Sequence, residues 1–311
     1  MLSRIADSLF WLSRYMERVE EMLRIARTHY IYSLDTNQTS NSWKPILQMF
    51  TDLSADRIAD LEHDNYSVLH YLLIDMNNEN STKNIILRAR ENARGIQDQI
   101  TREVWEEVNA IYHSINRPFI TMKLASSDAL EIIDLFLKHS MMYAGITDVT
   151  MQRGTGWNIM KLGKFVERTI ETLILVDKQF EIFDYDVSKE RDITNWRFLL
   201  LSLAGYEAYL KNYRNNKHNQ QLLHQVIFNP DFPHAVLYCL NQIDRSLRVL
   251  IKENSNPAVA DLLRTFGRMH SKVKFTDPVA LLKADVSVFF SELKQEIQDF
   301  NLQLRSIFFS Y

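Results

Sequence analysis

Glutamate and arginine alternate at helical spacing in this chain, and together these residue types can bind an amine and an anion. Glu17 and Arg18 follow Arg14 by three and four residues, so both lie on the same side of a helix as Arg14. The same pattern returns 150 residues later, as Lys164, Glu167 and Arg168. Carboxylate groups beside guanidinium or ammonium groups suit a zwitterionic ligand, because charge-assisted hydrogen bonds are the strong ones.

These charged stripes have two interpretations. On a solvated face, ion pairs at this spacing contribute only a few tenths of a kcal/mol each. However, Phe10 and Ile25 fall on the charged side of the first copy, and Met160 and Leu175 fall on that side of the second. A helix with large apolar residues on every side is usually covered on every side. The stripes are therefore either solvated, or buried with their charges paired.

A second charged cluster occurs between residues 90 and 109. We expect Glu91, Arg94 and Glu103 to lie on one long helix near Trp105, with Asn92 in the same segment. The second half of the chain has different residues 150 positions after Glu91 and Arg94, namely Asn241 and Asp244. We predict that Glu91, Arg94 and Glu103 line a ligand site, whereas the glutamates and arginines of the two stripes are mainly structural.

Glu207 is a further candidate, since it stands in the apolar segment 198–209. We expect this carboxylate to be buried and therefore to need a partner.

Composition restricts the class of protein. The chain has 311 residues, a net charge of -3 and 46% hydrophobic residues, so we expect a globular protein without a nucleic-acid or membrane partner. Cys239 is the only cysteine and forms no disulfide within the chain. No apolar run reaches the roughly 18 residues of a membrane span, and the N-terminal residues do not resemble a secretory signal. We expect a cytoplasmic location.

Seven glycines in 311 residues are too few for a fold rich in strands and turns, and they favour an all-helical protein. Apolar residues at spacings of three and four predict helices over residues 3–30 and 156–180. Further helices are expected after Ser81, after residues 229–233 and after Asp277-Pro278. Predicted loops lie at residues 35–42, 77–81, 184–194, 213–219 and 253–257.

The repeated segment predicts an internal duplication. Five of the twelve residues in 12–23 are identical to those in 162–173, and the same shift of 150 residues aligns Leu72-Leu73 with Leu222-Leu223. We therefore predict a duplicated helical bundle with repeats at 1–150 and 151–311, packed as one body.

Several motifs then occur in a fixed order, at residues 1–4 and 10–18, 90–94 and 103–106, 156–157 and 162–168, 206–209 and 231–233. Together they resemble the bacterial alpha-E domain family over nearly the whole chain. The resemblance implies an all-helical protein encoded beside a circularly permuted ATP-grasp ligase and a transglutaminase-like peptidase, which are its implied partners. It adds Trp157 to the candidate residues. Lys164 stands where the family more often has arginine.

Other kinds of site are poorly supported. A carboxylate-bridged di-iron bundle needs Glu-x-x-His, a motif that the sequence lacks, and we expect no metal and no cofactor. We favour an accessory or substrate-binding component of an ATP-grasp-linked system that makes or modifies a peptide, with a peptide or amino-acid ligand at the Glu/Arg cluster. The alternatives are an enzyme that uses glutamates as general acid and base, and a purely structural scaffold.

Overall fold

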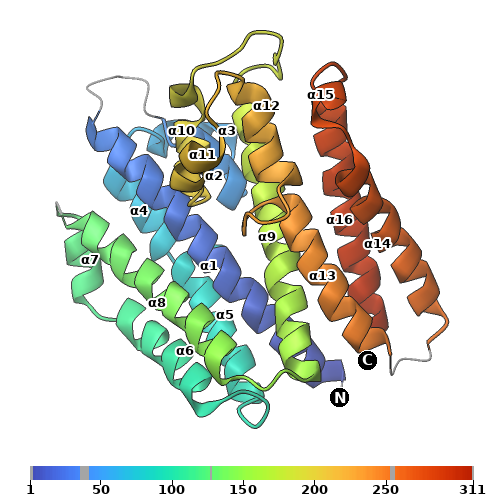
Figure 1. Ribbon diagram of the computed structural model, residues 1–311. Coiled ribbons are helices and arrows are strands. Elements are labelled where there is room, and N and C mark those ends of the chain that lie inside the picture. Colours follow the sequence, from blue (N-terminus) through green and yellow to red (C-terminus); the bar gives the residue numbers. More distant parts are fainter. Residues whose placement is uncertain (1–2, 36–41, 127, 253–255, 310–311) are drawn as a thin grey trace. The chain divides into compact units, whose positions relative to one another are not determined.

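The computed structural model describes residues 3–35, 42–126, 128–252 and 256–309, and 77% of these residues are helical (Figure 1). No strand occurs in these ranges. The prediction of an all-helical protein is confirmed.

The chain forms two compact units. Unit 1 comprises Met1–Phe10 and Gly154–Tyr311, and unit 2 comprises Trp11–Arg153. The division falls inside α1 (Ser3–Asp35) and one residue before α9 (Thr155–Glu181). Each unit therefore contains one of the two long helices that carry the charged stripes, with most of α1 in unit 2 and all of α9 in unit 1. Both helices extend slightly beyond the predicted ranges.

Unit 2 consists of most of α1 and the helices up to α8. Within it, α4 packs against α5 and α7, α5 against α6, and both α6 and α7 against α8. The bounds of its helices after α1 are α2 (Lys44–Phe50), α3 (Ala55–Leu61), α4 (Asn65–Leu73), α5 (Thr82–Gly95), α6 (Arg102–Ile115), α7 (Phe119–Leu124) and α8 (Ala129–Thr150).

Unit 1 is built around α9, which packs against α10, α13 and α16. In addition, α13 packs against α14, and α14 against α16. The bounds of its helices after α9 are α10 (Ile193–Ser202), α11 (Tyr206–Asn212), α12 (His218–Leu223), the π-helix η1 (His224–Phe228), α13 (Val236–Ile251), α14 (Ala258–Phe275), α15 (Pro278–Leu281) and α16 (Val286–Phe308).

Side-chain caps explain where several helices begin. Ser81 accepts a hydrogen bond from the Asn84 amide at the start of α5, as predicted, because its hydroxyl satisfies one of the otherwise unpaired first N–H groups. The prediction for the last helix was wrong in detail. Asp277-Pro278 begins only the one-turn helix α15, and the last long helix starts after Asp285, whose carboxylate accepts from the amides of Ser287 and Val288.

The predicted loops agree with the structure to differing extents. Residues 77–81 lie between α4 and α5, whereas 184–194 and 213–219 each include the first residues of the following helix. The predictions at 35–42 and 253–257 fall mainly on residues 36–41 and 253–255, outside the described part of the chain.

Each unit holds a buried tryptophan by the same device. In unit 2, Trp43 Nε1 donates to Asn65 Oδ1 at 2.7 Å, and in unit 1 Trp196 Nε1 donates to Asn219 Oδ1 at 3.1 Å. Both indoles are almost fully buried, where an unpaired N–H would be costly. The two tryptophans are 153 residues apart in the sequence, and the two asparagines are 154 residues apart. The constant shift of 150 residues therefore does not hold here.

Unit 1 also contains a very close helix approach. A Cβ atom built on Gly163 of α9 would lie 2.3 Å from the carbonyl oxygen of Phe10, which is far inside van der Waals contact. Only glycine allows α9 and the first turns of α1 to pack this closely.

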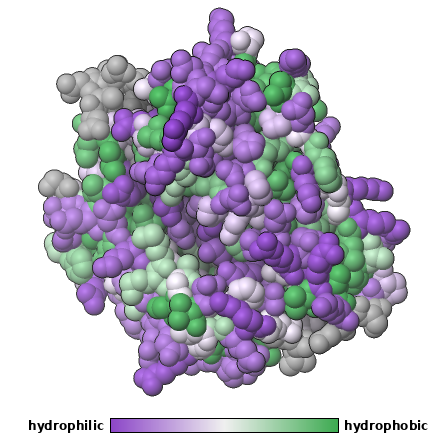
Figure 2. Space-filling model, in the orientation of Figure 1, coloured by the Kyte–Doolittle hydropathy of each residue, from purple (hydrophilic) through white to green (hydrophobic). Residues whose placement is uncertain are grey.

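The outer face seen in Figure 2 is mostly hydrophilic, with hydrophobic residues in separate patches. In the described part of the chain, no helix combines the length and the apolar character needed to cross a bilayer.

Candidate functional site

The thirteen candidate residues lie on five helices, and they differ in how far their side chains are buried. Unit 2 carries Arg14, Glu17 and Arg18 on α1, Glu91, Asn92 and Arg94 on α5, and Glu103 and Trp105 on α6, whereas unit 1 carries Trp157, Lys164, Glu167 and Arg168 on α9 and Glu207 on α11.

The motif on α9 is buried. Glu167 is 0% exposed and Arg168 is 6% exposed. One terminal nitrogen of Arg168 donates to the carbonyl oxygen of Pro233 at 3.3 Å, and Thr172 Oγ1, one turn later, donates to the carbonyl oxygen of His234 at 3.2 Å. These contacts hold α9 against the segment that leads into α13. This part of the motif therefore has a structural role in unit 1.

Lys164 and Trp157 lie on the same helix, α9, and are half-buried. The Trp157 ring lies 4.9 Å from the ammonium group of Lys161, which is within the range of a cation–π contact. Lys161 was not predicted from the sequence.

The motif on α1 is buried as well. Arg14 and Glu17 are 5% and 3% exposed, whereas Arg18 is half-buried. The Arg14 guanidinium lies 4.6 Å from the centre of the Trp11 ring. On α8, burial raises the pKa of Tyr143 to about 12, and the negative charge of Glu17 contributes to this increase. Of the two interpretations of the stripes, the buried one is correct for Arg14, Glu17, Glu167 and Arg168.

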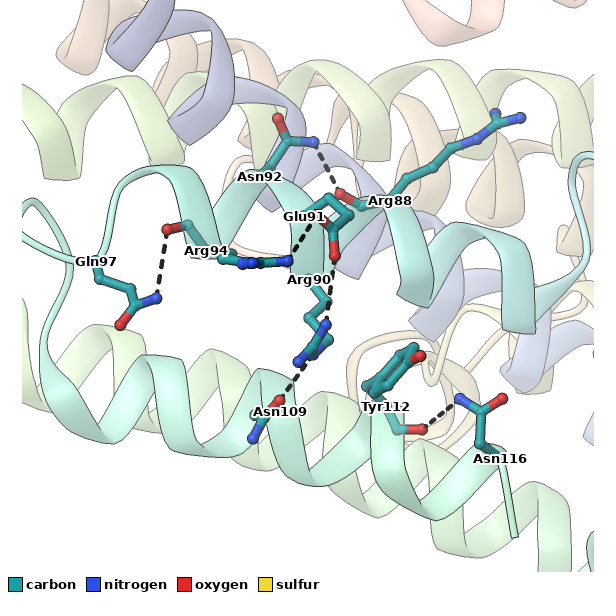
Figure 3. A network of polar contacts seen from close by, with 9 residues as sticks. All are labelled: Arg88, Arg90, Glu91, Asn92, Arg94, Gln97, Asn109, Tyr112 and Asn116. Atoms are coloured by element: carbon teal, nitrogen blue, oxygen red, sulfur yellow. Dashed lines mark hydrogen bonds and ion pairs between the residues drawn. The ribbon is translucent and has the colours of Figure 1, made fainter. Parts of the chain in front are cut away.

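The charged cluster on α5 and α6 is arranged differently, because its side chains reach the surface. Arg90, which is 21% exposed, connects the two helices: its Nε donates to Asn109 Oδ1 at 2.8 Å (Figure 3). Its guanidinium lies 4.4 Å from the centre of the Tyr112 ring and 5.8 Å from that of Trp105. Packing against both rings and one amide fixes the direction of the Arg90 side chain.

Glu91 joins two arginines in this network. Its carboxylate lies 3.3 Å from Arg90 and 3.8 Å from Arg94, and the Glu91 and Arg94 side chains are 53% and 64% exposed (Figure 3). Asn92 instead donates to the Arg88 carbonyl oxygen at 3.0 Å. We name Arg90, Glu91, Arg94, Trp105 and Tyr112 the Arg90 surface.

The expectation that Glu91, Arg94 and Glu103 share one helix was wrong. The helix that carries Glu91 ends at Gly95, and α6 begins after Thr101, whose hydroxyl accepts from the Val104 amide. The capping threonine starts a new helix, so Glu103 lies in the first turn of α6 and is exposed.

Glu207 was expected to be buried, and this was wrong too. The apolar run ends with α10 at Ser202, and Glu207 lies in the first turn of α11, where its side chain is exposed. A carboxylate near a helix N-terminus is favoured by the helix dipole without a buried partner.

The chemistry available at the Arg90 surface follows from its composition. Two guanidinium groups can receive a carboxylate or phosphate, the Glu91 carboxylate can receive an amine, and the exposed parts of the aromatic rings can contact apolar groups. Within the described residues, no group of three or more His, Cys, Asp or Glu side chains is placed to hold a metal ion.

Arg90 and Tyr112 were not predicted from the sequence as members of this network. Arg90 stands four residues before Arg94, a spacing that places both on one side of a helix and could have identified it. No local signal identifies Tyr112, because its contact with Arg90 joins two different helices.

Comparison with known proteins gives distant relatives. Uncharacterized proteins of Mycobacterium bovis and Mycobacterium tuberculosis are each 19% identical to the chain over 325 residues, covering 98% of this chain and 36% of the relative. The chain thus spans about a third of the length of these relatives. No solved structure matches it.

One family matches almost the whole chain, over residues 1–309, and is described as "a predicted alpha-helical domain with a conserved ER motif". Adjacent Glu and Arg residues occur within the long helices α1 and α9, as Glu17-Arg18 and Glu167-Arg168. The chain belongs to the alpha-E family.

Proposed function

We propose that this protein is an accessory, substrate-binding component of an ATP-grasp-linked system that makes or modifies a peptide. The resemblance described above implies a circularly permuted ATP-grasp ligase and a transglutaminase-like peptidase as partners. Because ATP-grasp ligases consume ATP, the proposal places the protein in the cytoplasm. In this proposal the Arg90 surface binds the peptide or amino acid.

The observation that supports this surface is the exposure of Glu91 and Arg94 beside a fixed Arg90. The Glu91 carboxylate lies 3.8 Å from the Arg94 guanidinium, and exposed ion pairs of this kind contribute about 0 to 1 kcal/mol. Exchanging this pair for a ligand's amine and carboxylate therefore costs little. Arg90, held on two rings, needs no reorganisation to present its guanidinium.

Glu91→Gln and Arg94→Gln variants test the proposal in a ligation assay with the ATP-grasp enzyme. We expect both variants to melt like the unmodified protein and to lose their support of the ligase. The matched control is Arg248→Gln, which removes an exposed arginine that is paired with Asp244 at 2.7 Å on α13 of unit 1. Its activity should be unchanged.

Three results would contradict the proposal. Full activity of both α5 variants would remove the site from the Arg90 surface. Turnover by the purified protein without any ligase would favour the alternative of an enzyme with glutamate acid–base chemistry. Failure of the protein to co-purify with its ATP-grasp neighbour, together with unchanged activity, would favour a structural scaffold.

We also propose that helices α1 to α8 and α9 to α16 derive from one duplicated ancestor. The support is a repeated pattern of neighbours: α2 contacts α3 as α10 contacts α11, α5 contacts α6 as α13 contacts α14, and α6 contacts α8 as α14 contacts α16. The pairs Trp43–Asn65 and Trp196–Asn219 occupy matching places in this order.

An experimental structure tests the duplication. Superposing α2 to α8 on α10 to α16 should bring Trp43 onto Trp196 and Asn65 onto Asn219. If the two indoles then lie in unrelated environments, the matching order of the helices is coincidental.

A further inference from the structure

A cavity of about 360 Å³ lies in unit 1, and none of the thirteen candidate residues lines it. Its lining comes from the segment after α11, from α12, from the start of η1 and from α15, and includes Tyr213, Asn215, Lys217, Gln221, His224 and Pro278. The volume is within the range of small-molecule sites. A π-helix, which begins at His224, is rare and often occurs at functional sites.

The orientation of His224 is set by Tyr213. The phenol oxygen of Tyr213 lies 2.6 Å from His224 Nδ1, and burial lowers the pKa of His224 and raises that of Tyr213. Both groups are therefore neutral at pH 7. A phenol that donates its proton to Nδ1 makes this nitrogen the acceptor of the neutral imidazole ring. The remaining proton of the imidazole then sits on Nε2, as a donor.

Hydrogen bonds also fix the amides beside His224. Gln221 is buried, its Oε1 accepts from the Tyr209 hydroxyl at 3.1 Å, and its Nε2 donates to Asn215 Oδ1. Tyr209 is held in turn by His218 Nδ1 at 2.9 Å. The wall of the cavity is therefore rigid and polar before any ligand arrives.

We propose that this cavity binds a small carboxylate, which accepts hydrogen bonds from His224 Nε2 and from the ammonium group of Lys217. Lys217 is exposed at the rim and supplies the positive charge among the cavity residues. Charge-assisted hydrogen bonds give a carboxylate an advantage over a neutral amide of the same shape. This site goes beyond the proposed function and does not depend on it.

A second cavity, of about 360 Å³, occurs in unit 2 and provides an internal comparison. It lies along α3 and α4, and its lining includes Arg57, His70 and Asp75. His70 precedes His224 by 154 residues, the same separation as that of Asn65 and Asn219. The Asp75 carboxylate places a negative charge there, so we expect this cavity to bind an anion more weakly.

Calorimetric titration of the full chain with N-acetylglycine tests the proposal, with N-acetylglycinamide as the uncharged probe of the same shape and inorganic phosphate as a second anion. We expect N-acetylglycine to bind and the amide to bind at least about tenfold more weakly, which is the effect of one charge-assisted contact. Lys217→Gln should weaken N-acetylglycine binding by about tenfold.

Two variants of His224 separate its two nitrogens. His224→Asn keeps an acceptor for the Tyr213 hydroxyl but removes the Nε2 donor, so it should fold normally and lose about tenfold in affinity. His224→Gln keeps a donor near the position of Nε2 and should bind more tightly than the Asn variant. Nitrogen NMR of the histidine side chains should show the Nε2–H tautomer at His224. The matched controls, Arg57→Gln and His70→Asn in the cavity of unit 2, should leave the affinity unchanged.

Several results would overturn the proposal. These are equal binding of the amide, no binding of N-acetylglycine by folded protein, tighter binding of phosphate than of the carboxylate, or an affinity that responds to the controls in unit 2 instead of to Lys217 and His224.

Discussion

Two regions of this molecule place the same residue types in different surroundings. On α9, Glu167 is 0% exposed and Arg168 is 6% exposed, whereas on α5 the Glu91 and Arg94 side chains are 53% and 64% exposed. In the first region a charge has left water and must be compensated within the protein, where removing a partner is costly. In the second region water screens the same pairing. Burial, and not residue type, therefore distinguishes the Glu/Arg motif that is enclosed by the fold from the one that reaches solvent.

The largest expected effect is that of Glu167→Gln. The amide has the shape of the carboxylate, but it replaces one acceptor oxygen with an NH₂ donor and removes the negative charge. We therefore predict a loss of roughly 3 to 5 kcal/mol in the free energy of unfolding. Urea denaturation followed by circular dichroism measures it. A variant that lost less than about 1 kcal/mol would remove the distinction between α9 and α5.

Stability should also depend on pH through His29, which lies on α1 with its ring 4.3 Å from that of Trp43. Burial lowers the pKa of His29 from 6.5 to about 4, so the unfolded chain binds this proton more tightly than the folded one. The contribution of His29 to the free energy of unfolding is fully present above pH 6.5 and is lost as the pH falls to about 4. The total loss is on the order of 3 kcal/mol.

Comparing the pH dependence of the unmodified protein with that of His29→Gln isolates this contribution. The difference in unfolding free energy between the two proteins should change between pH 6.5 and 4 and be constant above that window. A constant difference over the whole window would show that His29 is readily protonated in the folded state.

Gly163→Ala should destabilise unit 1 by about 1 to 3 kcal/mol, because the added Cβ meets a backbone oxygen that cannot rotate away. The matched control is Gly145→Ala in α8, where an added Cβ meets nothing within 4 Å. This change should stabilise the protein by about 0.5 to 1 kcal/mol, through helix propensity. Thermal melts of the two variants should therefore shift in opposite directions, and equal shifts would contradict the close packing of α9 on Phe10.

The smallest expected effect on stability is that of Glu91→Gln, at less than about 0.5 kcal/mol, because the charge is screened by solvent. For this variant the informative comparison is between the loss of activity in the ligation assay and the shift of the denaturation midpoint. The ligation assay should respond strongly while the denaturation midpoint stays in place. A large shift of the midpoint would make the Arg90 surface structural, like the motif on α9.

Particular residues show how far sequence reasoning reaches. The scarcity of glycine and the spacing of apolar residues predicted the helical class and the long helices α1 and α9, because both signals are local properties of the chain. The start of a helix after Ser81 was predicted for the same reason. The break between Gly95 and Thr101 was missed, since the apolar period continues through Ile96 and Ile100 while the Thr101 hydroxyl starts a new helix.

The sequence by itself determined that Glu and Arg share helix faces in both halves and that each of the two predicted long helices carries an adjacent Glu-Arg pair. Only the tertiary structure decided that Glu167 is buried and that Glu91 is exposed, because burial depends on which other helices cover a face and helical spacing does not encode this. The same holds for Arg90. Its position on the Tyr112 ring and its bond to Asn109 exist because α5 and α6 pack side by side, and no pattern within either helix specifies them.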